Sequence, residues 1–132
     1  MNTIKQIFCG ISFLLFFSSA YSQDISLSSP DEKLTVRLSL EGGSIYYQVL
    51  LDGKQMLDKS SLGLRGPQMD LSSGLELTGK DLRSIDETYT EPKIKKSTVR
   101  YQANELICKF QNANKNQLEV IFRVSNNDIA FR

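Results

Sequence analysis

KLTVRLSLEGGSIYYQVLLDGKQML, residues 33–57, is the stretch that decides the fold. Apolar side chains occupy every second position in two successive runs, first Leu34, Val36, Leu38 and Leu40, then Ile45, Tyr47, Val49 and Leu51. A period of two predicts strands with one buried face. Gly42-Gly43 and Asp52-Gly53 stand where tight turns are needed, and a third strand is expected to start at Gln55. The stretch therefore predicts an antiparallel meander.

The rest of the chain repeats this pattern. We expect an edge strand over residues 24–28 and a turn at Ser29–Glu32, where Pro30 presets φ. Residues 58–80 are rich in serine and glycine, which predicts a surface loop with short extended pieces around 62–64 and 75–77. Residues 81–90 are a further strand candidate.

The C-terminal part contains three better strand signals. Val99 and Tyr101 mark the first, and a slip in the alternation predicts a turn or bulge at Asn104. Inward faces follow at Leu106, Cys108 and Phe110 and at Leu118, Val120, Phe122 and Val124, with hairpin turns at 112–116 and 125–128. A last strand begins at residue 129 and the sequence stops inside it, so we expect an incomplete domain. The predicted fold class is all-β, an antiparallel β-sandwich over residues 23–132.

Residues 1–22 have the pattern of a secretory signal peptide. Lys5 precedes an apolar run, Ile7–Phe17, that is too short to span a bilayer. Ala20-Tyr21-Ser22 offers small residues at the two positions that a signal peptidase reads. The expected location is exported, periplasmic or secreted, with no membrane span after cleavage; an uncleaved anchor is the alternative.

Composition excludes several function classes. Sixteen basic and 15 acidic residues, without a basic stripe, argue against nucleic acid as a partner. The chain has no histidine, which excludes a Ser-His-Asp or Cys-His nucleophile system and histidine-bound zinc within it. Cys108 is the one cysteine outside the leader, and its place in an inward face predicts a buried small apolar residue.

The acidic residues do not predict an acid/base pair. Asp86 and Glu87 are adjacent, so a strand would direct them to opposite faces. Glu105 alternates out of the apolar face and is predicted to be solvated. Among the aromatic residues, Tyr46 and Tyr47 are consecutive, so one should face the core and one the opposite side. Tyr46 and Tyr89 are candidates for a sugar platform, although core or rim packing is the more ordinary role of strand tyrosines.

Five short motifs, in this order, carry a resemblance to a known family: Ser29-Pro30-Asp31, Ser61-Leu62-Gly63-Leu64, Ile85-Asp86-Glu87-Thr88-Tyr89, Asn104-Glu105-Leu106 and Ile129-Ala130-Phe131-Arg132. The set resembles the N-terminal domain of glycoside hydrolase family 97, exported bacterial enzymes that act on α-glucosides or α-galactosides. The resemblance covers most of residues 25–132.

The resemblance implies a parent enzyme with a mutarotase-like super-sandwich, a (β/α)8 barrel and a small C-terminal β-domain. It implies that the barrel holds the catalytic carboxylates and that calcium binds at the active site. No catalytic residue, metal ligand or cofactor is expected in this chain, which would support the cleft and pack on the barrel.

The substrate-binding candidates for an α-linked glycan are Tyr46, Tyr89 and Glu87. Two other functions stay open, a free-standing carbohydrate-binding module and a cell-surface interaction domain.

Overall fold

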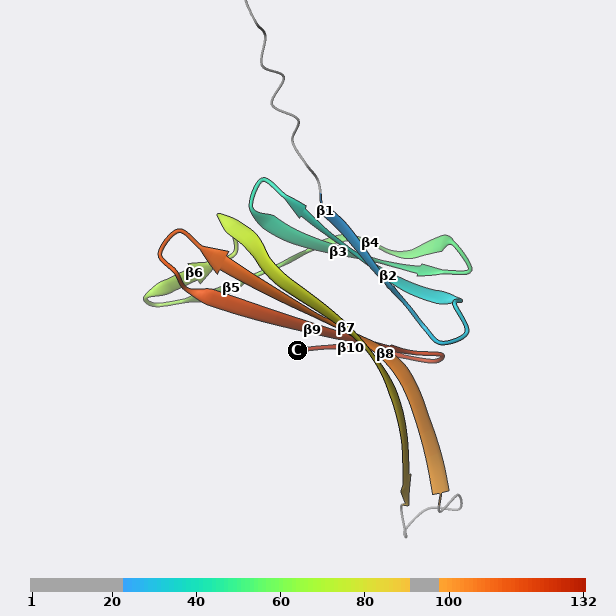
Figure 1. Cartoon of the computed structure of the whole chain (residues 1–132). Coiled ribbons are helices and arrows are strands. Elements are labelled where there is room, and N and C mark those ends of the chain that lie inside the picture. Colours follow the sequence, from blue (N-terminus) through green and yellow to red (C-terminus); the bar gives the residue numbers. More distant parts are fainter. Residues whose placement is uncertain (1–22, 91–97) are drawn as a thin grey trace, which may run out of the picture.

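The computed structural model describes residues 23–90 and 98–132, and every helix or strand assigned there is a β-strand (Figure 1). The predicted signal peptide lies outside the described residues. Within them, no helix is apolar and long enough to serve as a membrane span. The described part of the chain is all-β, and its sheets are antiparallel, as the alternation predicted.

The first sheet is the predicted meander. Its strands lie in the order β1-β2-β3-β4, with β1 at Gln23–Ser28, β2 at Leu34–Glu41, β3 at Ser44–Leu51 and β4 at Lys54–Leu62. The two connecting turns use positive φ angles, 55° and 78° at Gly42 and Gly43 and 49° and 76° at Asp52 and Gly53. Two consecutive residues with positive φ are the requirement of a type I′ hairpin turn, which explains these sequences.

One detail of the meander differs from the prediction. The expected inward face of β3 ended with Leu51, but Leu51 is exposed and Leu50 is buried instead. The pairing of β3 with β4 shifts register on both sides of Val49. Such irregularities disturb the strict alternation of a strand, and a pattern that assumes ideal pairing misses them.

The second sheet has the order β10-β9-β8-β7. Its strands are β7 at Leu75–Thr90, β8 at Thr98–Asn112, β9 at Gln117–Ser125 and β10 at Ile129–Phe131. In chain order, a small hairpin follows the first sheet and precedes the second. It consists of β5, Leu64–Gly66, and β6, Met69–Leu71. The hairpin projects to one side of the molecule in Figure 1.

The core lies between the two sheets. The first sheet supplies Leu27, Val36, Leu38 and Ile45, and the second supplies Leu75, Leu106, Cys108, Phe110, Val120, Phe122 and Val124. All of these except Leu27 and Leu75 belong to the inward faces that the alternation predicted. Tyr47 turns inward, and its ring centroid lies 5.7 Å from that of Phe122 and 5.6 Å from that of Phe131. Burial raises the pKa of the Cys108 thiol to about 11, which agrees with a packing role.

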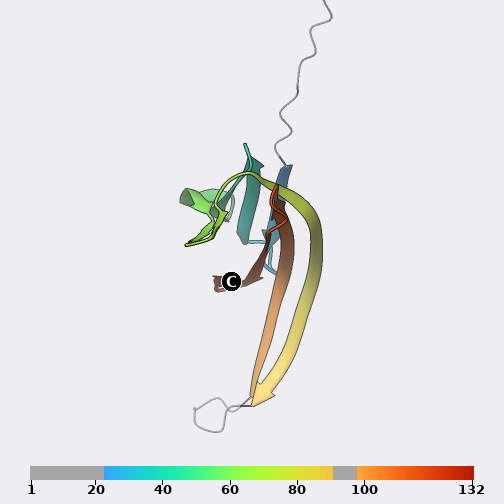
Figure 2. The same ribbon diagram turned by 90° about the vertical axis from the view of Figure 1, so that its left-hand side faces the viewer.

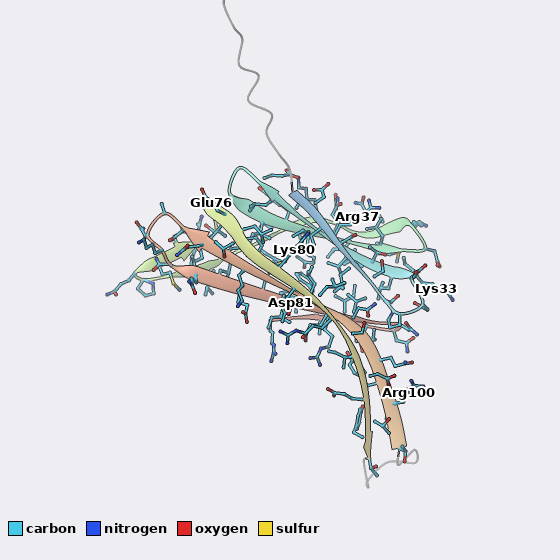
Figure 3. All side chains as sticks on the ribbon, in the orientation of Figure 1. Lys33, Arg37, Glu76, Lys80, Asp81 and Arg100 are labelled. Atoms are coloured by element: carbon cyan, nitrogen blue, oxygen red, sulfur yellow. The ribbon has the colours of Figure 1, made fainter. Side chains whose placement is uncertain are left out.

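The outer parts of β7 and β8 continue past the first sheet as a two-stranded arm, residues 86–90 paired with 98–102 (Figure 1). The side view in Figure 2 shows that these long strands are curved. Charged side chains cover the outside of the molecule, for example Arg37 on β2 and Arg100 on the arm (Figure 3).

Two predictions about irregular structure were wrong. The bulge expected at Asn104 is absent, because β8 pairs with β7 without a shift from Gly79 to Thr90; the irregularity lies between Leu77 and Gly79. The expected loop at 58–80 is largely strand, divided among the end of β4, β5, β6 and the start of β7. Backbone pairing imposed by the sheets overrides the weak β-propensity of its serines and glycines.

Gly43 provides a test of this chain path. A Cβ added there would lie 2.8 Å from the backbone nitrogen of Gly74, and the residue already has a positive φ. Gly53 has a similar φ of +76° but no atom within 4 Å of such a Cβ. Positive φ alone costs about 1–2 kcal/mol for a residue with a Cβ. We expect Gly43→Ala to destabilise the protein clearly more than Gly53→Ala in urea unfolding, and equal losses would contradict the close approach of Gly43 to Gly74.

Candidate functional site

Tyr46, the first of the sugar-platform candidates, lies on the outer face of the first sheet. It stands opposite Ser61 in the pairing of β3 with β4. The Lys59 ammonium lies 4.7 Å from the centre of the Tyr46 ring, a cation–π contact. Lys59 also forms an ion pair with Glu41, and that hydrogen bond lowers the pKa of the Glu41 carboxyl. The prediction that Tyr46 and Tyr47 face opposite sides is confirmed.

A polar groove of about 570 Å³ begins beside Tyr46. We call it the Tyr46 groove. It runs from the start of β3 and the end of β4 to the region of the β5–β6 hairpin. Most of its lining residues carry a hydroxyl group, and the full lining is Ser44, Tyr46, Ser61, Leu62, Gly63, Arg65, Ser72 and Ser73. Lys59 is not part of this lining, since it borders a neighbouring hollow with Glu41 and Gln48. The structure thus brings Tyr46 together with residues of the 58–80 segment.

A hydrogen-bond network fixes the far wall of the Tyr46 groove. The Ser72 hydroxyl donates to Asp70 Oδ1 at 2.5 Å and accepts from Arg65 Nε at 2.9 Å. Arg65 Nε also lies 3.4 Å from Asp70 Oδ2. The Ser72 hydrogen bonds, from its hydroxyl and its backbone N–H, lower the pKa of Asp70. From the near wall, the Ser44 hydroxyl donates to the Ser72 carbonyl at 3.2 Å.

Tyr89 and Glu87 lie elsewhere, near the end of the arm. Tyr89 pairs with Val99 and Glu87 with Tyr101, both close to the end of the β7–β8 ribbon. Figure 1 shows this end directed away from the first sheet, which carries Tyr46. The three predicted substrate-binding residues therefore do not form one site within this part of the chain.

Asp86 and Glu87 take opposite faces of β7, as adjacent strand residues must. Asp86 accepts hydrogen bonds from Arg100 at 2.8 and 2.5 Å and from Gln102 at 3.2 Å. The Arg100 hydrogen bond, reinforced by its positive charge, lowers the pKa of Asp86. A carboxylate held in this way is a stable anion and is unsuited to act as a general acid at neutral pH.

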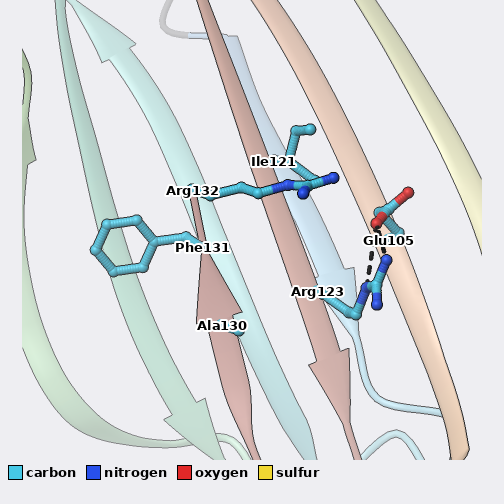
Figure 4. Close-up of a pocket in the computed structure, with 6 residues that line it drawn as sticks. All are labelled: Glu105, Ile121, Arg123, Ala130, Phe131 and Arg132. Atoms are coloured by element: carbon cyan, nitrogen blue, oxygen red, sulfur yellow. Dashed lines mark hydrogen bonds and ion pairs between the residues drawn. The ribbon is translucent and has the colours of Figure 1, made fainter.

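The prediction that Glu105 is solvated was wrong, because the residue is only 7% exposed. Glu105 stands directly opposite Arg123 in the β8–β9 pairing and accepts hydrogen bonds from Arg123 Nε at 3.1 Å and from its terminal nitrogen at 2.7 Å (Figure 4). The buried neighbours Ala103 and Ile107 flank it on the same face of β8. The pair lines a hollow of about 190 Å³ together with Ile121, Ala130, Phe131 and Arg132. The predicted hairpin loop at 112–116 contained the necessary signal, since it sets the register that aligns Glu105 with Arg123.

Within residues 23–90 and 98–132, no group of three or more Cys, Asp or Glu side chains is arranged to hold a metal ion. The calcium implied by the family resemblance therefore has no matching ligand set in the described part of the chain.

Comparison with known proteins gives the family. The family model described as Glycosyl-hydrolase 97 N-terminal matches residues 27–132. A probable retaining alpha-galactosidase of Streptomyces bingchenggensis is 29% identical over 129 residues, which cover 92% of this chain and 20% of that protein. A retaining alpha-galactosidase of Bacteroides thetaiotaomicron is 28% identical over 134 residues, covering 97% and 19%. The chain thus spans about a fifth of the length of these relatives.

Solved structures agree with the family match. A beta-arabinopyranosidase is similar with a TM-score of 0.77 and 43% identity, over 83% of this chain and 18% of that one. A glycoside hydrolase family 97 enzyme from Pseudoalteromonas sp. strain K8, in complex with panose, has a TM-score of 0.76 and 22% identity, over 81% and 17%. The second likeness shows the fold alone. Since the family model covers residues 27–132 and the β-sandwich has its counterpart in these enzymes, the chain belongs to the glycoside hydrolase family 97 N-terminal domain family.

Proposed function

We propose that this chain is the N-terminal carbohydrate-associated part of an exported glycoside hydrolase, and that it supports an active-site cleft built mainly by a separate barrel domain. The observation that carries the proposal is the family match over residues 27–132, combined with coverage of only about a fifth of the relatives. The leader pattern of residues 1–22 supports export.

The state of the acidic residues supports a non-catalytic role. A glycosidase acid needs a raised pKa and a second carboxyl group about 5–9.5 Å away across the scissile bond. The described carboxyl groups with a clearly shifted pKa, on Asp31, Glu41, Asp70 and Asp86, are all shifted downward. Each is held as an anion by hydrogen bonds from serine, lysine or arginine. This chain thus offers a scaffold, and we assign the chemistry to the other domain.

The relatives narrow the proposed substrate. Two are named alpha-galactosidases and one, 43% identical, is a beta-arabinopyranosidase. L-Arabinopyranose has the ring stereochemistry of D-galactose and lacks only the hydroxymethyl group. We therefore favour substrates of galactose-like configuration over α-glucosides, and retention of configuration over inversion. Retention would place the two catalytic carboxyl groups of the barrel about 5–5.5 Å apart.

The substrate proposal is tested on the protein that is expressed from the whole reading frame containing this chain. Aryl α-galactoside, β-L-arabinopyranoside and α-glucoside are compared by kcat/KM, and the anomer first formed is identified by NMR. We expect the two galactose-like substrates to be preferred and configuration to be retained. A reading frame that encodes no barrel would overturn the proposal, and a preference for the α-glucoside would overturn its substrate assignment.

The chain by itself is expected to hydrolyse no glycoside. The test incubates it with aryl α-glucoside and α-galactoside, beside the same chain carrying Asp86→Asn and Glu87→Gln. We expect no release of the aryl group above background from either. Turnover that is present in the first and lost in the second would place the chemistry within this chain and refute the scaffold role.

One observation favours a second candidate, a free-standing carbohydrate-binding module. The Tyr46 groove combines an aromatic ring with several hydroxyl groups, as a sugar site requires. The same reading-frame experiment separates the two candidates, since a binding module needs no barrel.

A further inference from the structure

We propose that the Tyr46 groove binds a neutral oligosaccharide, with Tyr46 as its aromatic wall and Arg65 and the serine hydroxyls as its hydrogen-bonding groups. The inference rests on the proposed function, which makes α-linked glycans the ligands that this domain encounters. It goes further by placing a sugar site on the N-terminal chain itself.

The size of the groove suits this ligand class. Its volume of about 570 Å³ falls in the range of roughly 300–1,000 Å³ that small-molecule sites occupy. The hollow beside Glu105 and Arg123 is smaller, at about 190 Å³. The walls of the Tyr46 groove come from three separate parts of the chain: β3, the β4–β5 connection and the segment after β6.

The groups along the groove match the surface of a sugar. A hydroxyl donates one hydrogen bond and accepts others, so serines pair with sugar hydroxyls in either direction. Ser72 is committed to Asp70 and Arg65, and Ser44 to the Ser72 carbonyl. Ser61 and Ser73 form no side-chain hydrogen bond with other residues of the part that the structure describes. Arg65 uses only Nε toward Ser72 and Asp70, and its side chain is 75% exposed.

Tyr46 supplies the apolar contact. The C–H face of a pyranose ring removes apolar surface from water when it lies on an aromatic ring. Lys59 contacts the Tyr46 ring and borders the neighbouring hollow, while Tyr46 itself lines the groove.

The charges near the groove favour a neutral ligand. Arg65 is paired with Asp70, and Lys59 with Glu41. Each positive side chain thus has a carboxylate beside it, which leaves no excess of either sign to attract an anionic or cationic ligand. Hydrogen bonding and ring contact remain as the basis of recognition, and neutral sugars are recognised in this way.

The walls of the groove are held in place before a ligand arrives. Gly63 approaches Ser72 so closely that a Cβ would lie 2.7 Å from the Ser72 Cα. The bond from Ser44 to the Ser72 carbonyl ties β3 to the same segment. Fixed groups lose little freedom on binding, which raises the affinity available from a few hydrogen bonds.

The test titrates the chain with panose and, separately, with melibiose, following amide chemical shifts by NMR. We expect saturable shifts at the groove with a Kd of about 1 mM or tighter for at least one sugar. Tyr46→Ala and Arg65→Gln should each weaken binding about tenfold or more, which is the loss of one good contact. The Arg65 variant keeps the test informative if the Tyr46 variant fails to fold, because Arg65 is exposed.

Arg83→Gln is the matched control for Arg65→Gln, since it removes an exposed arginine of the second sheet that is likewise paired with an aspartate, Asp81. It should leave binding unchanged. Absence of saturable shifts with both sugars, or binding lost in Arg83→Gln and kept in Arg65→Gln, overturns the groove assignment. If binding fails while the protein with its barrel hydrolyses glycosides, the groove proposal falls and the proposed function stands. If the chain binds sugar but its reading frame encodes no barrel, the groove proposal stands and the proposed function falls.

Discussion

Phe122→Ala is expected to lower the free energy of unfolding by about 3–5 kcal/mol, the loss typical of a buried phenylalanine. The Phe122 side chain is 0% exposed and lies at the centre of the core between the sheets. Its ring also contacts Tyr47 and Phe131, with centroids 5.7 and 5.4 Å away. Removing the ring leaves a cavity between the two sheets, and Tyr47 and Phe131 each lose a ring contact. Urea unfolding of the protein measures the change.

Phe131→Ala is the matched control for this prediction. Phe131 belongs to the same aromatic cluster but is 51% exposed, so less apolar surface returns to water when it is removed. We expect a clearly smaller loss than for Phe122→Ala. Equal losses, or an unchanged midpoint for Phe122→Ala, would show that β9 does not pack against the first sheet in the way described.

The sequence predicted most of the fold because the alternation of β2 and β9 is regular. Val36, Leu38, Phe122 and Val124 occupy the inward positions that a period of two requires. Prediction failed where tertiary pairing decides the outcome. Residues 58–80 form short strands because neighbouring strands supply hydrogen-bond partners, and local composition carries no record of such partners.

The candidate site was only partly predictable, for the same reason. Opposite orientations of Tyr46 and Tyr47 follow from strand geometry alone. The groove beside Tyr46 depends on how the chain after β6 returns against β3, through the contact of Ser44 with Ser72, which are 28 residues apart. The separation of Tyr89 from Tyr46 likewise depends on the length and direction of the arm, which no local pattern specifies.

Arg123→Met is the second change for which we expect a large effect. It would leave the Glu105 carboxylate, whose side chain is 9% exposed, without the two hydrogen bonds from Arg123. Breaking a buried ion pair by removing one partner costs about 3–5 kcal/mol, because the remaining charge is buried and uncompensated. We expect the lower end of that range, since the Arg123 side chain is 36% exposed and water reaches its position. Urea unfolding again measures the loss.

The double variant Glu105→Gln with Arg123→Met distinguishes the stranded charge from lost packing. It has no buried anion, so it should recover much of the stability that Arg123→Met loses, giving a strong coupling between the two sites. Arg83→Met is the matched control on the same sheet, because it breaks the exposed pair with Asp81, with side chains 59% and 54% exposed, and should change stability little. If the double variant is less stable than Arg123→Met alone, the loss comes from packing of the Arg123 and Glu105 side chains, and the buried-charge explanation is wrong.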